Sequence, residues 1–398
     1  MNYILFDDKT WEQLLPLTFT RPVSEVRLGI LTIKEKWEKY LQASCSYYTK
    51  DYLQQKFPME QEKDNLFINS SLIPTAELLS EMENLELNQV LKSGDIVCAL
   101  RTHKIDPITF DPSSYSKGAE IQTISDLIKI SYPWDIFQMN GDGIEHDFKL
   151  ITKGRKSQAI SKTNNIIGDK EIFIERGAVV EFATINTKNG PVYIGKGAEV
   201  MENSAIRGPF ALCAQSTVKM SAKIYGPTTI GPNSKVGGEL NNVVIFGNSN
   251  KAHDGFLGNS VIGEWCNLGA DTNNSNLKNN YAEVKLWSYQ SDQFVKTGLQ
   301  FCGLIMGDHS KCGINTMFNT GTVVGVAANI FGDGFPRNFI PSFTWGGSHK
   351  FTECRIDTAY EIAQRVMERR GLVFDEKEQQ IINEVFKRTA KYRVSFQK

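Results

Sequence analysis

His253 is the residue whose type and surroundings best suit acid–base chemistry. It lies in the segment KAHDGFLGN (251–259), between Lys251 and Asp254, in a chain with only five histidines. Because imidazole changes its charge near neutral pH, a histidine can take a proton from an attacking amine and pass it on. A lone histidine on a surface turn is, however, also a common structural residue. The elements that hold His253 therefore decide between the two interpretations.

An aliphatic residue recurs every six positions through the middle of the chain. The first run is Ile194, Val200, Ile206, Leu212, Val218, Ile224, Ile230 and Val236. After a two-residue slip we expect the phase to resume at Val244 and Phe256, and a third run extends from Met306 to Ile330. Neither a helix nor an alternating strand has this period. It is typical of the hexapeptide repeat of a left-handed parallel β-helix.

Such a β-helix buries a continuous aliphatic column by stacking its coils. At about 18 residues per three-sided coil, residues 166–346 would supply about ten coils. A Gly-rich β-sandwich, the alternative, has no fixed six-residue phase. His253 follows the slip, where the regular wall is disturbed. Residues 273–298 leave the rhythm and predict an extruded loop, which in a solenoid often contributes to a binding site.

The two ends of the chain follow other patterns. Residues 1–165 alternate strand-like and helix-like segments, which predicts an α/β domain. We expect the β-helix over residues 166–350. Residues 351–398 carry apolar positions at helical spacing and predict helices that cap the solenoid, the second of them starting with a capping box of Asp375 and Glu378.

Composition narrows the class of protein. The 44 basic and 45 acidic residues nearly balance, so no nucleic-acid partner is expected. The seven cysteines are scattered, which indicates buried thiols in a reducing compartment. The first residues have no basic signal-peptide start, and the uncharged stretch 314–332 is too rich in Asn, Thr and Gly for a membrane span. We therefore expect a cytoplasmic protein with no membrane partner.

The segment KAHDGFLGNSVIGEWCNLGAD (251–271) resembles the active-site segment of the bifunctional N-acetylglucosamine-1-phosphate uridyltransferase/glucosamine-1-phosphate acetyltransferase family. The family pattern is Lys-Ala-x-His, followed by Leu-Gly and Ile-Gly hexads and by Asn-Ile/Leu-Gly-Ala. The resemblance implies that His253 is the general base for a sugar amine that attacks acetyl-CoA. It also implies a homotrimer with acetyl-CoA bound between neighbouring solenoids.

The same resemblance implies a set of substrate-binding residues. They are Glu239, Asn241, Lys251, Phe256, Asn267 and Asn276. Three positions depart from the family pattern. Phe256 stands where a phosphate-contacting tyrosine is common, Asn241 stands where a lysine is expected, and Leu277 replaces the tyrosine of an Asn-Tyr pair. These departures leave the identity of the sugar open.

Two stretches near the N-terminus resemble sugar-1-phosphate nucleotidyltransferases. Residues 14–38 resemble the segment that follows the Gly-rich loop of those enzymes, and YPWDIFQMN (132–140) resembles a Pro-Trp-Asp-Leu element. The Gly-rich loop itself is absent, and FDDKTWEQ (6–13) stands in its place. The lysine of the Pro-Lys-Pro element falls on Val23.

A nucleotide would then need other partners for its phosphates, which such a loop holds with backbone N–H groups and basic side chains. Arg21 and Arg27 are the candidate nucleotide-binding residues. Asp7 and Asp8, at the end of the first predicted strand, are candidate ligands of Mg²⁺. The alternative is that the arginines are exposed charges in a domain that has lost its site.

The resulting hypothesis is an enzyme with two transferase activities. The β-helix would acetylate an amino-sugar 1-phosphate from acetyl-CoA, and the α/β domain would transfer a nucleotidyl group from an NTP to a sugar 1-phosphate with Mg²⁺. One alternative keeps nucleotidyl transfer alone, for example from dTTP to glucose 1-phosphate, with the β-helix for assembly. Another is a non-catalytic trimeric scaffold or sensor. A zinc enzyme is not expected, because His253, His309 and His349 are widely spaced.

Overall fold

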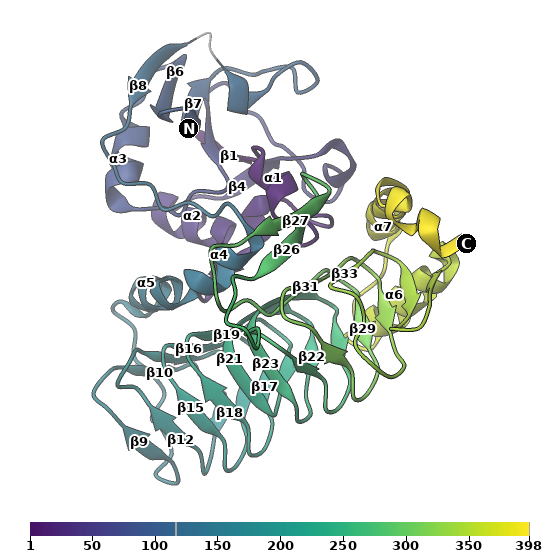
Figure 1. Cartoon of the computed structure of the whole chain (residues 1–398). Helices are drawn as coiled ribbons and strands as arrows, with labels where there is room; N and C mark the ends of the chain where they lie inside the picture. The colour runs from purple at the N-terminus through teal and green to yellow at the C-terminus, as the bar shows by residue number, and fades with distance from the viewer. Residues whose placement is uncertain (116–117, 398) are drawn as a thin grey trace. The chain divides into compact units, whose positions relative to one another are not determined.

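The computed structural model describes residues 1–115 and 118–397 (Figure 1). The chain forms two compact units. The α/β unit consists of Met1–Leu14, Thr20–Val26 and Leu31–Tyr132. The solenoid unit consists of Leu15–Phe19, Arg27–Ile30 and Pro133–Lys398. Two short segments near the N-terminus therefore belong with the larger, C-terminal unit, and the predicted division at residues 165 and 350 stays a prediction.

The α/β unit is built on one six-stranded sheet with the order β4-β1-β5-β7-β6-β8. The strands are β1 (Asn2–Phe6), β4 (Cys45–Tyr48), β5 (Asn65–Asn69), β6 (Gln89–Ser93), β7 (Ile96–Thr102) and β8 (Ala119–Gln122). Its α-helices are α1 (Thr10–Gln13), α2 (Ile33–Leu41) and α3 (Ala76–Glu83). Strands β4, β1 and β5 are parallel, so their carboxyl ends meet at one edge of the sheet. The predicted α/β fold is confirmed.

The solenoid unit contains a parallel β-helix of about ten coils, as predicted. Each coil contributes strands to three columns, A, B and C. Column A holds β10 (Ile172–Ile174), β13 (Val192–Ile194), β16 (Phe210–Leu212), β19 (Thr228–Ile230), β28 (Leu304–Met306), β31 (Thr322–Val324) and β33 (Phe339–Ile340). Column B holds β11 (Val179–Val180), β14 (Glu199–Val200), β17 (Thr217–Val218), β20 (Lys235–Val236), β22 (Asn250–Lys251), β24 (Asn267–Leu268), β29 (Lys311–Cys312), β32 (Asn329–Ile330), β34 (Thr344–Gly346) and the antiparallel β35 (Phe351–Glu353).

Column C continues the wall on the third side. It holds β9 (Asn165–Ile167), β12 (Thr184–Asn186), β15 (Ala205–Arg207), β18 (Lys223–Tyr225), β25 (Asn273–Asn274) and β30 (Met317–Phe318). Two nine-residue strands, β21 (Glu239–Gly247) and β23 (Phe256–Glu264), run through both column C and column A. Figure 1 shows the strands stacked coil upon coil.

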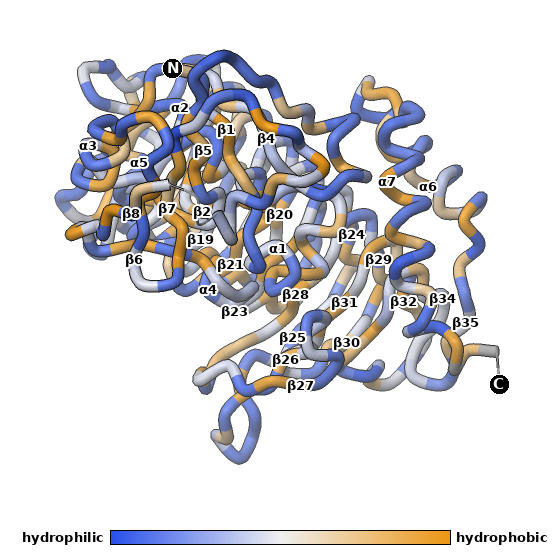
Figure 2. The backbone as a smooth tube through the Cα atoms, turned by 90° about the horizontal axis from the view of Figure 1, so that it is seen from above, coloured by the Kyte–Doolittle hydropathy of each residue, from blue (hydrophilic) through white to orange (hydrophobic). Residues whose placement is uncertain are grey.

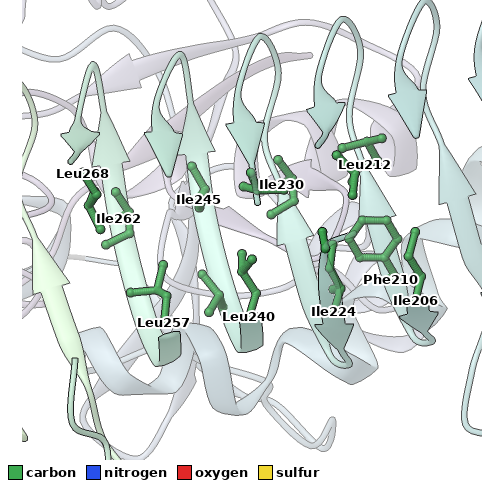
Figure 3. Packing of buried hydrophobic residues seen from close by; sticks show 14 of the residues in the cluster. Ile206, Phe210, Leu212, Ile224, Ile230, Leu240, Ile245, Leu257, Ile262 and Leu268 are labelled. Atoms are coloured by element: carbon green, nitrogen blue, oxygen red, sulfur yellow. The ribbon is translucent and has the colours of Figure 1, made fainter. Parts of the chain in front are cut away.

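An aliphatic column fills the interior of the coils. Ile230, Ile245 and Ile262 are in register on adjacent strands and point inward with the other labelled residues of Figure 3. Because successive coils repeat the same inward positions, one continuous core results.

The hexad count was wrong at the slip. It predicted Val244 and Phe256 as inward residues, but Ile245 and Leu257 take these places. The cause is coil length. Lys251 pairs with Val236 only 15 positions earlier, whereas Val236 pairs with Val218, 18 positions earlier. This coil is three residues shorter, and the inward positions resume one residue later than the hexad count predicted.

The segment predicted as an extruded loop forms an antiparallel hairpin. Its strands are β26 (Lys285–Ser288) and β27 (Gln293–Lys296). At the tip, Asp292 accepts a hydrogen bond of 2.6 Å from Lys391 Nζ and another from the Tyr392 hydroxyl. The hairpin is therefore tied to the C-terminal segment.

Two C-terminal helices follow the last coil, α6 (Ile356–Glu368) and α7 (Glu376–Arg388). Both alternate hydrophilic and hydrophobic stretches (Figure 2). Asp375 caps α7 by accepting the backbone N–H of Glu378 at 3.0 Å. No helix in the described part of the chain combines the length and apolar character that crossing a bilayer requires.

Residues 27–30 are held by the first helices of the solenoid unit, α4 (Pro133–Gln138) and α5 (Asn140–Thr152). The buried Asn140 Oδ1 accepts hydrogen bonds from the Gly29 backbone at 2.9 Å and from Thr229 Oγ1 at 3.0 Å. The buried Asp147 accepts one from the Ile30 backbone at 2.8 Å. This early segment is thereby bonded to a helix and a solenoid strand.

Candidate active site

His253 lies at an exposed corner of the solenoid, between β22 and β23. Lys251 points inward from β22, at the position that Val236 occupies one coil earlier. Its Nζ donates hydrogen bonds to the carbonyl oxygens of His253, at 2.6 Å, and Asp254, at 3.0 Å. Burial lowers the pKa of Lys251 to about 8. The lysine therefore fixes the backbone that presents the imidazole, and its predicted contact with substrate stays a prediction.

The surface around this corner is made largely of backbone. Gly238, on the preceding coil, has a φ of +73°, and a Cβ there would lie 2.7 Å from the Gly255 carbonyl oxygen. Gly255 has a φ of +110°, and its Cβ would lie 2.2 Å from the Thr272 carbonyl oxygen. Only glycine fits at either position. The imidazole of His253 makes no hydrogen bond or ion pair within residues 1–115 and 118–397.

Four of the predicted substrate-binding residues lie on or beside column C, which begins at this corner. Glu239 is in register with Phe256, and Asn241 is in register with Gly258. Asn276 reaches the same strand, because its Nδ2 donates to Asn259 Oδ1 at 2.8 Å. The inward neighbours Leu240 and Leu257 are buried. Glu239, Asn241 and Phe256 alternate with these inward residues and so face outward.

Strand β18 adds two residues that sequence reasoning missed. Lys223 is in register with Glu239, and Tyr225 is in register with Asn241. Both are exposed, and Ile224 between them is buried. A lysine and a tyrosine hydroxyl thus lie one coil away from Asn241, where the expected lysine is missing, and two coils away from Phe256, where the expected tyrosine is missing. The one-residue offset from the buried hexad position identifies both residues as outward.

Asn267, the sixth predicted substrate contact, lies elsewhere, on column B. It lines a cavity of about 450 Å³ beside the end of helix α6. Lys235, Asn250, Asn267 and Lys311 form one outward-facing ladder, because each is in register with the next on four adjacent strands. Arg369 and Arg370, which follow α6, complete the lining. The structure therefore groups Asn267 with four cations.

A second lysine in this cavity repeats the arrangement at His253. Lys311 Nζ donates to the carbonyl oxygen of His309 at 2.7 Å, and burial lowers the pKa of Lys311 to about 8. The His309 ring is stacked on Trp265, with ring centroids 6.1 Å apart and planes 14° from parallel. Trp265 has a φ of +62°, unusual for a bulky residue, and lines the cavity.

Asp7 and Asp8 lie where β1 ends, at the edge where the parallel strands finish. Asp7 accepts hydrogen bonds from the Val23 backbone at 3.0 Å, from Thr49 Oγ1 at 2.5 Å and from Ser70 Oγ at 2.7 Å. Despite these bonds, burial raises the pKa of Asp7 to about 6. Near neutral pH the Asp7 carboxyl group is therefore mostly ionised, but it takes up a proton more readily than an ordinary aspartate does.

Asp8 has different partners. Its Oδ2 accepts a hydrogen bond of 3.1 Å from Asn69 and lies 3.7 Å from Lys129 Nζ. Burial by itself would raise the pKa of Asp8, but the Lys129 ammonium and the hydrogen bonds from Thr10 and Asn69 together lower it. Among the described residues there is no cluster of three His, Cys, Asp or Glu side chains suited to a metal ion. The two aspartates fit Mg²⁺ only if phosphate oxygens complete its shell, as is usual for this ion.

The two predicted nucleotide-binding arginines have different surroundings. Arg21 is a buried residue of the α/β unit whose charge favours the ionised form of Glu25. Arg27 belongs to the solenoid unit, where its Nε donates to the Phe246 carbonyl oxygen at 3.1 Å and its terminal nitrogen donates to the Ile30 carbonyl oxygen. Neither is the exposed charge that the alternative hypothesis assumed. A contact of either residue with nucleotide stays a prediction.

Comparison with known proteins finds a family match over the N-terminal residues and relatives that cover about half of the chain. Residues 3–156 match the family described as sugar nucleotidyl transferase. A bifunctional protein GlmU of Methanocaldococcus jannaschii is 32% identical over 199 residues, which cover 49% of this chain and 41% of the relative. The chain thus spans about two fifths of the length of that relative.

Two further proteins show the extent of the likeness. A bifunctional sugar-1-phosphate nucleotidylyltransferase/acetyltransferase of Sulfurisphaera tokodaii is 27% identical over 229 residues, covering 54% of this chain and 56% of the relative. A solved Arabidopsis UDP-N-acetylglucosamine acyltransferase covers 59% of this chain and 94% of its own, at 14% identity and a TM-score of 0.25, too low to bear on function. The chain therefore combines a segment that matches the sugar nucleotidyl transferase family with a parallel β-helix, and about half of the chain is similar to bifunctional nucleotidyl- and acetyltransferases.

Proposed function

We propose that this chain is a transferase with two activities, acetylation of an amino-sugar 1-phosphate at the solenoid and nucleotidyl transfer to a sugar 1-phosphate at the α/β unit. The observation that most directly supports acetylation is the exposed imidazole of His253, on a corner that the buried Lys251 amine holds by two carbonyl oxygens. The match of residues 3–156 to sugar nucleotidyl transferases supports the second activity.

The acetylation step uses His253 as general base. The sugar amine forms a bond to the acetyl carbon of acetyl-CoA and gives its proton to the imidazole, and the carbon–sulfur bond breaks as the thiolate leaves. The imidazolium then returns the proton to the thiolate. Backbone N–H groups beside the corner are the natural donors to the oxyanion that develops on the acetyl oxygen. Glu239, Asn241, Phe256 and Asn276 would orient the sugar phosphate.

In the α/β unit, Asp7 and Asp8 would hold Mg²⁺ together with the nucleotide phosphates, and the ion would neutralise charge on those phosphates. Arg21 is the proposed phosphate contact within this unit, and the contact of Arg27 with nucleotide stays a prediction. Lys129, which already pairs with Asp8, lies at the same edge. We infer a cytoplasmic homotrimer that binds acetyl-CoA between neighbouring solenoids and makes a UDP-N-acetylglucosamine-type product. Light scattering on the purified chain would measure the trimer.

The first test is thiol release from acetyl-CoA with glucosamine 1-phosphate, using the full chain. His253→Ala should lower kcat by about 10²- to 10⁴-fold, the usual contribution of a general base. His349→Ala is the matched control, because His349 is an exposed histidine of the same unit whose Nε2 lies 2.7 Å from Asp333 Oδ1. Equal turnover of the wild type and His253→Ala would remove the assigned base.

The second test is pyrophosphate release with a panel of NTPs and sugar 1-phosphates. We expect release with at least one pair, and we expect Asp8→Asn to lower it, since the carboxylate charge would be lost. No release with any pair would contradict nucleotidyl transfer and leave acetylation as the only activity.

A further inference from the structure

The cavity on column B is separate from the corner that presents His253, and its lining indicates a binding site of its own. We propose that it binds a ligand with a diphosphate group. The ladder of Lys235, Asn250, Asn267 and Lys311 forms one wall, and Arg369 and Arg370 approach it from the end of α6. All six side chains carry N–H donors, and lysine and arginine are the usual partners of phosphate.

The charge of this cavity is unbalanced. Its lining includes four cations and no acidic side chain. None of Lys235, Lys311, Arg369 and Arg370 makes an ion pair within the described 1–115 and 118–397. Burial and, second, repulsion from Arg369 lower the pKa of Arg370. Arg369 therefore disfavours the charge of Arg370, and a bound anion would relieve that repulsion.

The spacing of the cations selects the class of anion. Lys235 and Lys311 lie three strands apart, which is about 14 Å along the column at the usual strand separation. A single phosphate cannot contact both ends of such a ladder, whereas a diphosphate and its substituent extend along it. The volume of about 450 Å³ is in the range of small-ligand sites. Asn248, which also lines the cavity, has a buried amide oxygen with no hydrogen-bond partner in the described chain.

Arg370 also connects the end of α6 to the wall of the cavity. One of its terminal nitrogens donates to the Asn233 carbonyl oxygen, and the other lies 3.5 Å from Asn250 Oδ1. These contacts place the end of α6 against column B. Arg369, exposed beside it, keeps all its donors for a ligand, since no hydrogen bond or ion pair of its side chain is recorded in the described residues.

Two ligands share the diphosphate chemistry, coenzyme A and a nucleoside diphosphate. Isothermal titration of the full chain with inorganic pyrophosphate, coenzyme A and UDP, each without Mg²⁺, distinguishes them. We expect pyrophosphate to bind and one of the other two to bind more tightly. Binding to Lys235→Met/Arg369→Gln should be at least tenfold weaker, because two charge-assisted contacts are lost. Both substitutions are at exposed positions, so the fold should be kept.

Lys196→Met is the matched control, because Lys196 is an exposed solenoid lysine outside the cavity. It should bind all three probes like the wild type. His253→Ala should also bind pyrophosphate normally, so failure of the acetylation mechanism would not affect this result. As a second readout, pyrophosphate should change the fluorescence of the wild type but change that of Trp265→Phe less. Binding of no probe, or equal affinity of the double variant and the wild type, would overturn the proposal.

Discussion

The Nζ of Lys251 lies 2.6 Å from the carbonyl oxygen of His253, so an inward-pointing lysine fixes the backbone of the residue that we assign as base. Lys251→Met keeps the length of the side chain and removes both hydrogen bonds. We expect kcat for acetyl transfer to fall about tenfold, because a general base must be held within hydrogen-bond reach. KM for the sugar phosphate should stay near the wild-type value. A variant with normal kcat would show that the backbone of His253 keeps its position without the hydrogen bonds from Lys251.

The buried Lys251 also predicts a pH dependence of stability. Burial lowers its pKa in the folded chain to about 8, below the usual lysine pKa of 10.5. Between these values the unfolded chain binds the extra proton, so wild-type stability should rise with pH. The wild type minus Lys251→Met difference in the free energy of unfolding should therefore increase from pH 8 to pH 10, by on the order of 1–3 kcal/mol. Urea titrations of both proteins at the two pH values measure it, and a flat difference would contradict the lowered pKa.

Tyr225 should set the affinity for the sugar phosphate. Tyr225 is exposed and is in register with Asn241 on column C, where we place the sugar phosphate. If the hydroxyl contacts the phosphate, Tyr225→Phe should raise KM for the acceptor about three- to tenfold with little change in kcat. Tyr281→Phe, at an exposed position of the inserted segment, is the control. Identical KM values for the three proteins would exclude Tyr225 from the site.

Asp7 predicts the opposite pH dependence to Lys251. Burial raises its pKa in the folded chain to about 6, above the usual aspartate pKa of 3.8. In this window the folded chain binds the extra proton, so the stability that Asp7 contributes should fall as pH rises through it. Relative to the wild type, Asp7→Asn should gain stability, of order 1 kcal/mol, between pH 4.5 and pH 7. Calorimetric scans at both pH values test this, and a constant difference in melting temperature would show an ordinary carboxyl group.

Arg27 should act on stability before it acts on nucleotide binding. Arg27→Met leaves the carbonyl oxygens of Phe246 and Ile30 without their buried donor, which should cost about 2–4 kcal/mol of stability. Arg207→Met, at an exposed solenoid position, should cost almost nothing. If Arg27→Met instead keeps its melting temperature and raises KM for NTP, the nucleotide-binding role is the correct one.

Most of the solenoid could be predicted from the sequence, because each coil repeats one physical requirement. An inward aliphatic residue every six positions leaves a periodic record, and Val218 and Val236 follow it. The prediction erred at Val244 and Phe256 because the shortened coils around Lys251 shift the register by one. An inward lysine cannot be recognised by hydropathy, although the Lys251 amine is bonded to two backbone carbonyl oxygens.

The cavity on column B could be predicted from the sequence only in part. The hexad phase identifies Lys235, Asn267 and Lys311 as outward neighbours of inward residues, so their common face could have been derived. That Arg369 and Arg370 meet them depends on where α6 ends in space, and no local pattern encodes that contact. Trp265 also lies on the cavity wall.

The bond between Arg27 and Phe246 joins residues 219 positions apart in sequence. During synthesis, Arg27 can therefore form this hydrogen bond only after most of the early solenoid has been made. Gly29 and Ile30 likewise can form theirs only after α5 has been made. Although the chain forms two compact units, residues 27–30 can complete their contacts only after the later unit has been synthesised. A truncated chain that starts at residue 133 would lack the backbone N–H groups of Gly29 and Ile30, which donate to Asn140 and Asp147, so the two units should be studied together.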